Sequence, residues 1–171
     1  ALRAQLGIDR YVELGHSVGC GMAVHCAAAN GDGACDALIT IAAQACVEER
    51  TLQGIRDARD QFQAHPAQLE RLARYHGGDQ SRARWALNAW IDTWLHPDFA
   101  GWSLQSALGR VTCPVLALHG ALDEYGSTEQ AVRIARWAAG PARVEILLGA
   151  GHVPHREQPQ AVAGLVAGFV D

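Results

Sequence analysis

Short apolar runs alternate along the chain with longer segments of helical periodicity. The apolar runs predict strands at residues 11–14, 37–41, 114–119 and 143–148, because each is short and three of them are followed directly by Gly. Such alternation is typical of parallel strands joined by crossover helices. We therefore predict the α/β fold class, with a mostly parallel sheet flanked by helices and functional groups at the carboxyl ends of the strands.

The helices between these strands are marked by terminal signals. A helix over residues 18–29 is expected to end at Asn30-Gly31, where a left-handed cap costs little. Ser127 and Gln130 have the spacing of a capping box, which predicts another helix start. A final helix is expected from Pro159 to Phe169, with proline in its first turn.

The strand pattern disappears between Cys46 and Arg110. Three helical segments follow one another there, divided by Pro66, by two glycines at 77–78 and by Pro97. We interpret this stretch as a helical insertion that forms a cap. The predicted organisation is a nucleophile-bearing part of the core, the cap, and a carboxyl-terminal part of the core, over residues 1–47, 48–110 and 111–171.

Four of the five tryptophans lie in this insertion. Leu87, Trp90, Ile91 and Trp94 share one helical face by their i, i+3, i+4 spacing. One interpretation is that this stripe packs the insertion onto the main domain. The other is an aromatic lid over a substrate pocket, with Trp90 and Trp94 as substrate-binding residues.

Composition places the chain among ordinary globular proteins, with 49% hydrophobic and 19% charged residues. The net charge is −4, all basic residues are Arg, and the acidic and basic residues of the insertion balance. No basic patch is predicted, so we expect no nucleic-acid partner. The absence of Lys excludes a Schiff-base or P-loop lysine. The longest apolar stretch, at 37–47, is too short to span a membrane, so no membrane partner is expected.

The five cysteines form no C-x-x-C pair and lie in apolar segments, which favours buried free thiols in a reducing, cytoplasmic compartment. The histidines lack carboxylate or cysteine neighbours at ligand spacing, so no metal is indicated. A dinucleotide fingerprint is missing, and no cofactor is expected. The lack of Lys together with abundant Ala and Arg suggests a bacterial gene.

The sharpest motif is Gly-His-Ser-Val-Gly at residues 15–19, directly after a predicted strand and directly before a predicted helix. This is the context of a nucleophile elbow, in which Ser17 takes a strained backbone conformation above the sheet. A side chain at either flanking glycine, Gly15 or Gly19, is expected to collide with the neighbouring strand or helix.

These residues resemble the α/β-hydrolase superfamily, which orders its triad as Ser, acid and His along the chain. The resemblance implies that Asp123, in the turn after a late strand, is the acid. It also implies that His152, in a Gly-His pair followed by Glu157-Gln158-Pro159, is the base. Three motifs in the family's order therefore predict a catalytic triad of Ser17, Asp123 and His152.

In such a triad a neutral imidazole takes the serine proton during attack, and the carboxylate orients the ring. The backbone N–H of Val18 is the expected first donor of the oxyanion hole. The second donor belongs in the family to a loop after an earlier strand, which would precede Ala1. We therefore interpret the chain as the carboxyl-terminal part of a hydrolase, lacking the first strands of the core.

Other residues could fill these roles. His155 is an alternative base, although the Gly-His pairing favours His152. Glu124 is an alternative acid without the family's spacing, and Glu48 or Glu49 would serve only if the acid came earlier in the chain. His16 either packs behind the elbow or donates a hydrogen bond near the pocket as a substrate-binding residue.

A serine nucleophile points to an ester, lactone or related acyl bond of a small molecule, cleaved through an acyl-enzyme. The motif also resembles carbon–carbon hydrolases of the meta-cleavage type, which often carry Trp directly after the catalytic histidine. Here that position is Val153, predicted to contact substrate. A carboxylate on the substrate could be bound by cap arginines such as Arg71, Arg74, Arg82 or Arg84. A hydrolase-fold protein that only binds its ligand is a further alternative, and a homo-oligomer is left open.

Overall fold

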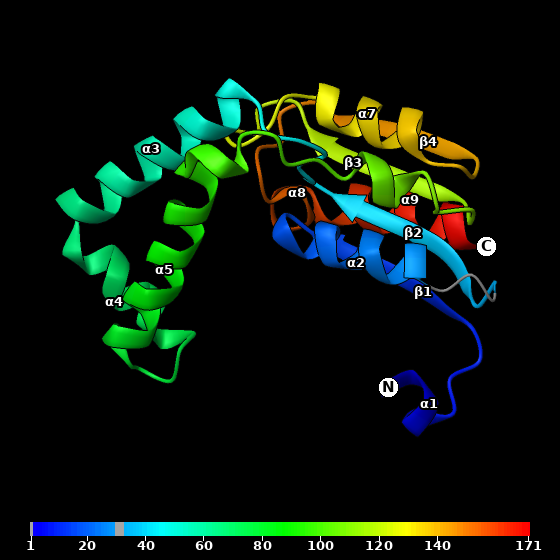
Figure 1. Ribbon diagram of the computed structural model, residues 1–171, viewed down its shortest axis with the longest axis horizontal. Coiled ribbons are helices and arrows are strands. Elements are labelled where there is room, and N and C mark those ends of the chain that lie inside the picture. Colours follow the sequence, from blue (N-terminus) through cyan, green and yellow to red (C-terminus); the bar gives the residue numbers. More distant parts are fainter. Residues whose placement is uncertain (1, 30–32) are drawn as a thin grey trace. The chain divides into compact units, whose positions relative to one another are not determined.

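The computed structural model describes residues 2–29 and 33–171 (Figure 1). The chain divides into two compact units. One, the α/β unit, comprises Ala1–Cys46 and Ser103–Asp171, and the other, the helical unit, comprises Val47–Trp102. The predicted insertion covers residues 48–110. In the structure the segment from Ser103 to Arg110 belongs instead to the α/β unit.

Within the described residues, the α/β unit contains one four-stranded sheet with the order β1-β2-β3-β4. All neighbouring strands are parallel. The predicted fold class is confirmed, and each strand lies within two residues of its predicted bounds. The strands are β1 (Tyr11–His16), β2 (Cys35–Ile41), β3 (Val115–Gly120) and β4 (Ala142–Leu147).

Helices flank this sheet and supply most of the apolar cover that parallel strands require. Val162 of α9 lies in a core cluster with strand residues such as Ile39 and Leu116. Helix α2 buries one stripe at i, i+3, i+4 and i+7, beginning at Cys20. The helices of this unit are α1 (Leu2–Leu6), α2 (Val18–Ala29), α6 (Gln105–Leu108), α7 (Glu129–Trp137), α8 (Pro154–Glu157) and α9 (Pro159–Val170).

Several predicted details of the helices differ. The capping box is wrong: α7 begins at Glu129, and the buried side chain of Gln130 instead binds the loop after β2. Cys26 is exposed rather than buried, because it falls outside the buried stripe of α2. The predicted helix stop at Asn30-Gly31 lies outside the described residues.

The helical unit contains α3 (Glu49–Ala64), α4 (Pro66–Arg74), α5 (Gln80–Leu95) and the short 3-10 helix η1 (Pro97–Phe99). The predicted breaks are confirmed, since proline begins α4 and η1 and two left-handed glycines precede α5. Asp79 caps α5 by accepting hydrogen bonds from the N–H groups of Ser81 and Arg82.

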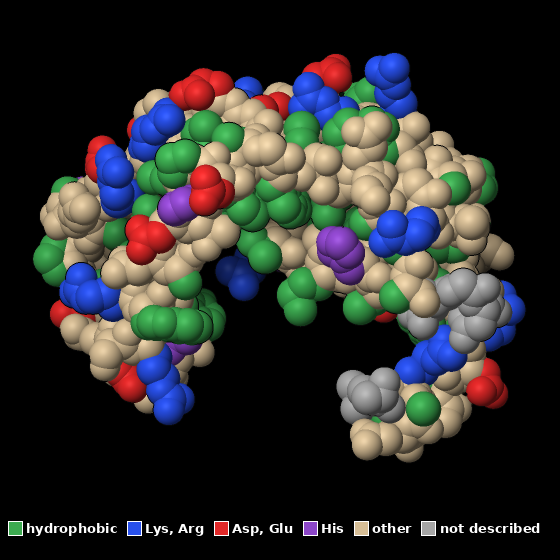
Figure 2. Space-filling view, viewed as in Figure 1, with side chains coloured by type: hydrophobic (Ala, Val, Ile, Leu, Met, Phe, Trp, Pro, Cys, Tyr) green, Lys and Arg blue, Asp and Glu red, His purple; other side chains and the backbone are tan. Residues whose placement is uncertain are grey.

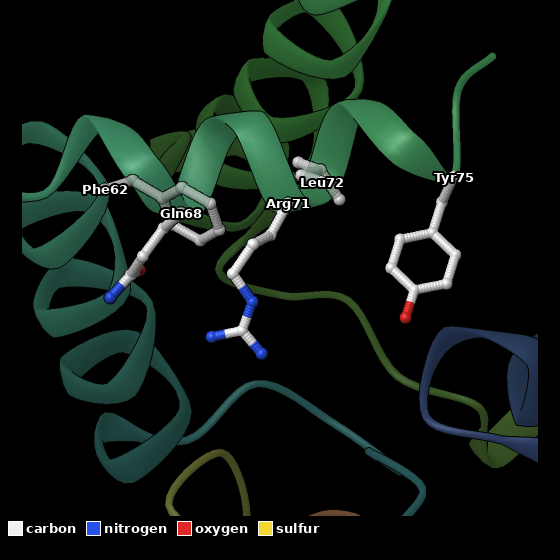
Figure 3. A pocket seen from close by; sticks show the side chains of 5 residues that line it. All are labelled: Phe62, Gln68, Arg71, Leu72 and Tyr75. Atoms are coloured by element: carbon white, nitrogen blue, oxygen red, sulfur yellow. The ribbon is translucent and has the colours of Figure 1, made fainter. Parts of the chain in front are cut away.

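The helical unit has a small apolar interior. Leu69, Ala73 and Ala83 form its buried cluster. At the far end of α5, Trp94 contacts the rings of Phe99 and Trp102 at centroid distances of 5.2 and 5.3 Å. A surface pocket of about 250 Å³ is lined by Phe62, Gln68, Arg71, Leu72 and Tyr75 (Figure 3).

Charged side chains of both signs are interspersed over the helical unit on the face shown in Figure 2. Three of its arginines pair with nearby carboxylates: Arg56 with Glu49, Arg59 with Asp60, and Arg82 with Asp79. Among the helices of the described residues, none combines the length and apolar character that crossing a membrane requires.

Candidate active site

Ser17 lies in the tight turn between β1 and α2. Its φ of +53° is in the left-handed region, which is uncommon for a residue with a side chain. The turn is held because Ser17 N–H donates to Ile41 O at 2.9 Å. A Cβ at Gly15 would lie 2.6 Å from Cys20 Cα, so the predicted need for glycine there is confirmed. The same expectation for Gly19 is wrong, since the described residues leave open space beside it.

Asp123 lies in the turn after β3, and its side chain is fully buried. Its Oδ1 accepts the N–H of Tyr125 at 2.8 Å. β3 ends at Gly120, where a Cβ would overlap the carbonyl oxygens of Ala150 and Gly151. Glycine at 120 therefore allows the turn that carries the carboxylate to lie directly against the loop that carries His152.

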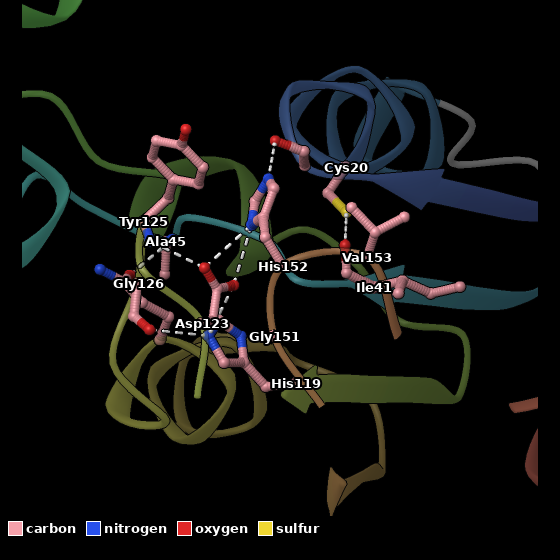
Figure 4. A network of polar contacts seen from close by, with 12 residues as sticks. Cys20, Ile41, Ala45, His119, Asp123, Tyr125, Gly126, Gly151, His152 and Val153 are labelled. Carbon is pink, nitrogen blue, oxygen red and sulfur yellow. Dashed lines mark hydrogen bonds and ion pairs between the residues drawn. The ribbon is translucent and has the colours of Figure 1, made fainter. Parts of the chain in front are cut away.

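His152 bridges the serine and the carboxylate (Figure 4). Its Nδ1 lies 3.0 Å from Asp123 Oδ1 and 2.9 Å from Oδ2, and its Nε2 lies 2.9 Å from Ser17 Oγ. A carboxylate accepts hydrogen bonds, so in the neutral ring Nδ1 carries the proton. Nε2 is then free to accept the serine proton.

The backbone on both sides of His152 is fixed by one carboxylate. Glu157 accepts the N–H of Gly151 at 2.6 Å and the N–H of Val153 at 3.1 Å. The carbonyl oxygen of His152 lies 2.8 Å from Nε2 of His16, which is the last residue of β1. A carbonyl can only accept, so His16 donates this hydrogen bond.

His16 also contacts a second imidazole. Its ring centroid lies 4.6 Å from that of His155 and 5.1 Å from that of His152. Burial lowers the pKa of His16 below its ordinary value of about 6.5. The ring of His16 therefore contacts both other rings, and the ring that reaches Ser17 is that of His152.

A cysteine follows the serine by one turn of helix, but its chemistry is suppressed. Cys20 is fully buried, and its Sγ lies 3.3 Å from Ile41 O. Burial raises the pKa of its thiol to about 12, so the reactive thiolate is scarce at neutral pH. Ser17 is thus the accessible nucleophilic atom at the elbow.

Of the remaining candidate residues, Val18 and Val153 belong to the α/β unit, and Trp90 and Trp94 belong to the helical unit. Val18 is the first residue of α2, so its N–H belongs to a helical turn without intrahelical acceptors. Val153 follows His152 directly and precedes α8. Trp90 and Trp94 belong to the helical unit, where Ile91 and Trp94 are buried and Trp90 and Leu87 are partly buried.

The alternative acids are placed differently. Glu124 is exposed, while its neighbour Asp123 is buried and reaches His152. Glu48 and Glu49 lie in the helical unit at the start of α3. Of these carboxylates, Asp123 is the one that the structure brings to the histidine.

The roles of three residues that hold the site were not predicted from sequence, although Glu157 and Gln130 belong to motifs noted there. His119, on β3, lies 3.3 Å from Asp123 Oδ2 and is fully buried. Gln130 binds backbone groups of Ala45 and Cys46, and Glu157 clamps the histidine loop. A histidine inside an otherwise apolar strand is a signal that could have found the first, because a buried polar group needs a partner.

The alpha/beta hydrolase family model matches residues 2–165, and the chain belongs to this family. A comparison with curated proteins found no significant match.

Solved structures share the fold. The chain is 21% identical, with a TM-score of 0.74, to a membrane phospholipase A described as a bacterial virulence factor, and covers 59% of it. For proline iminopeptidase of Mycobacterium smegmatis the identity is 22%, the TM-score 0.67 and the coverage 68%. For the enol-lactonase of Burkholderia xenovorans LB400 these values are 23%, 0.62 and 68%. Each alignment includes 99% of this chain.

Proposed function

We propose that the protein is a serine hydrolase that cleaves an ester, lactone or related acyl bond of a small molecule. The observation that carries the proposal is the unbroken line of contacts from Ser17 through His152 to Asp123, at 2.9 Å on either side of the ring. A nucleophile, a base and an orienting acid in hydrogen-bond reach are the geometry that acyl transfer requires.

The reaction begins when Ser17 Oγ attacks the acyl carbon and its proton passes to His152 Nε2. Asp123 stabilises the imidazolium through Nδ1–H and keeps its own charge. Collapse of the tetrahedral intermediate returns the proton from Nε2 to the leaving group and leaves an acyl-Ser17 ester. Water then attacks this ester with His152 again as base, which releases the acid and restores the serine.

The negative oxygen of each intermediate needs donors that are already in place. Val18 N–H is the proposed donor within this chain, because it begins α2 and the positive end of the helix dipole lies there.

The substrate class is proposed from the nucleophile and from the fold relatives. Attack by a serine hydroxyl suits acyl carbons, and the relatives named above include a lactonase, a phospholipase and an iminopeptidase by their titles. We propose His16 and Val153 as residues at the substrate, since both adjoin His152. The helical unit is proposed as a cap whose Trp90 and Trp94 shape the acyl site.

Hydrolysis of p-nitrophenyl esters of increasing chain length tests the proposal. The native protein should turn over at least the acetate ester, and Ser17→Ala should lower kcat by about 10³-fold or more. Ser106→Ala is the matched control, because Ser106 is an exposed serine of the same unit. If Ser17→Ala and Ser106→Ala were equally active, the proposed nucleophile would be wrong.

A further inference from the structure

The penultimate residue of β3 is a histidine that the proposed reaction does not use. His119 is 0% exposed, and its Nε2 lies 3.1 Å from Gly126 O and 3.3 Å from Asp123 Oδ2. Figure 4 shows this ring beside the carboxylate, on the side away from Tyr125. Because a carbonyl oxygen can only accept, Nε2 carries a proton and donates it to Gly126 O, and Asp123 Oδ2 lies 3.3 Å from the same nitrogen.

Three nitrogen atoms lie close to the carboxylate of Asp123 in a defined arrangement. His152 Nδ1 is nearly equidistant from the two oxygens, at 3.0 and 2.9 Å. Tyr125 N–H donates to Oδ1 at 2.8 Å, and His119 Nε2 lies near Oδ2. The two outer donors act on different oxygens, so together they oppose rotation of the carboxylate about its Cβ–Cγ bond.

Burial makes these donors more important. Asp123 is 0% exposed, so water cannot replace a lost hydrogen bond at its oxygens. A charged acceptor also forms stronger hydrogen bonds than a neutral one. The outer donors therefore contribute to both the orientation and the solvation of the charge that faces His152.

The loop after β3 is shaped around the His119 ring. A Cβ at Gly126 would lie 3.2 Å from His119 Cε1 and 3.3 Å from Nε2, which is tighter than ordinary contact. The residue at 126 is thus small where the imidazole lies, and its carbonyl binds that imidazole. These contacts fix where the Nε2 proton points.

We propose that His119 is a positioning residue, whose Nε2–H holds Asp123 Oδ2 so that the carboxylate faces His152 Nδ1. Its effect on rate rests on the proposed function. The contact between His119 and Asp123 is a property of the folded chain, so it can be tested without turnover.

The test compares three substitutions at one position. Glutamine places an amide N–H near the position of Nε2, so His119→Gln retains the donor. His119→Leu keeps an apolar volume and removes it, and His119→Asn keeps polarity but is too short to reach Oδ2. We expect the leucine variant to lower kcat for p-nitrophenyl acetate roughly ten- to hundredfold, as loss of a hydrogen bond to a charged group does, with KM little changed. The glutamine variant should recover most of that loss.

A second readout is an NMR signal from the hydrogen bond that Asp123 makes to His152. That signal is the low-field proton resonance of His152 Nδ1–H, which reports the hydrogen bond between His152 and Asp123 and so the orientation of the carboxylate. Recorded by NMR on each folded variant, it should shift in the leucine and asparagine variants and return towards the native value in the glutamine variant. If leucine prevents folding, the asparagine and glutamine pair carries the comparison.

Two outcomes would overturn the inference. One is an unchanged resonance and kcat in both the leucine and asparagine variants. The other is an equal loss with glutamine and leucine, which would mean that the ring is needed for packing alone. A native protein without esterase activity would count against the proposed function, while the resonance would still decide whether His119 orients the acid.

Discussion

The two units of this chain differ in where they place polar groups. The α/β unit buries Thr40, Gln44, His119, Asp123 and Gln130, whereas the helical unit, within the described residues, buries Thr51 among its polar side chains. Buried polar groups are costly unless they are paired. They lie near the carboxyl ends of the strands, where their burial costs free energy of folding and their hydrogen bonds fix the loops of the candidate site.

The helical unit is built in the opposite way. Its helices bury narrow apolar faces and leave their charges at the surface, in pairs such as Arg56 with Glu49. Exposed ion pairs add little stability and constrain little. The comparison teaches that the α/β unit fixes the geometry of the candidate site with buried polar contacts, while the buried interior of the helical unit is mainly apolar.

The strongest expected effect comes from the acid. Asp123→Asn should lower kcat by about 10⁴-fold, because an amide at this position lets His152 hold its proton on the wrong nitrogen. Steady-state ester hydrolysis checks this, with the exposed neighbour Glu124→Gln as control. Similar kcat values for these two variants would contradict the assignment of the acid.

The next effect concerns the meeting of two loops. Gly120→Ala should destabilise folding by about 3 kcal/mol and lower activity, because its Cβ overlaps backbone oxygens that cannot move aside. Gly164→Ala on α9 is the control, since the described residues leave open space there. Urea unfolding of both variants measures the difference. Equal free energies of unfolding would mean that the loops after β3 and β4 move apart to accept the Cβ. The geometry of the α/β unit would then be less rigid than this account states.

The third prediction concerns the helical unit. If it forms a lid, Trp90→Ala should change kcat/KM roughly three- to tenfold for long-chain esters and much less for acetate. Trp85→Ala on the same helix is the control, because Trp85 is 74% exposed. An equal loss on every ester would assign the stripe to packing.

The smallest effect is on the pH dependence of stability. Burial lowers the pKa of His16 in the folded protein, whereas the unfolded chain titrates near the ordinary value of about 6.5. Between these values the unfolded state binds more protons, so stability should fall as pH drops below about 6.5. The urea midpoint should fall less between pH 7.5 and 5.5 in His16→Gln than in the native protein. His25→Gln, on the exposed side of α2, should behave like the native protein.

Much of the fold could be predicted from the sequence, because strands and elbow depend on local pattern. Residues 115–118 are apolar, as is typical of a strand buried on both faces. Glycine is needed at position 15 because the backbone of Cys20, only five residues away, lies against it. The Gly-His-Ser-Val-Gly motif by itself predicts the tight turn between strand and helix. The order of serine, acid and histidine then follows from the family resemblance.

The remaining features depend on side-chain partners that residue spacing does not identify. Gln130 matches a capping box by spacing, yet its side chain is taken by Ala45 and Cys46, some 85 residues earlier in the chain. The contact of His119 with Asp123 requires the turn after β3 to fold back over the ring. A histidine in an apolar strand indicates that it needs a polar partner but does not identify Asp123, and the spacing of Gln130 from Ser127 predicts the wrong partner.

The central claim is that the Ser17–His152–Asp123 line activates the serine. Intact mass after incubation with a fluorophosphonate tests it most directly, in native, heat-denatured and Ser17→Ala protein. The account predicts a single adduct in the native protein that maps to Ser17 and is absent from the other two samples. An adduct that persists in Ser17→Ala, or that forms equally in denatured protein, would contradict it.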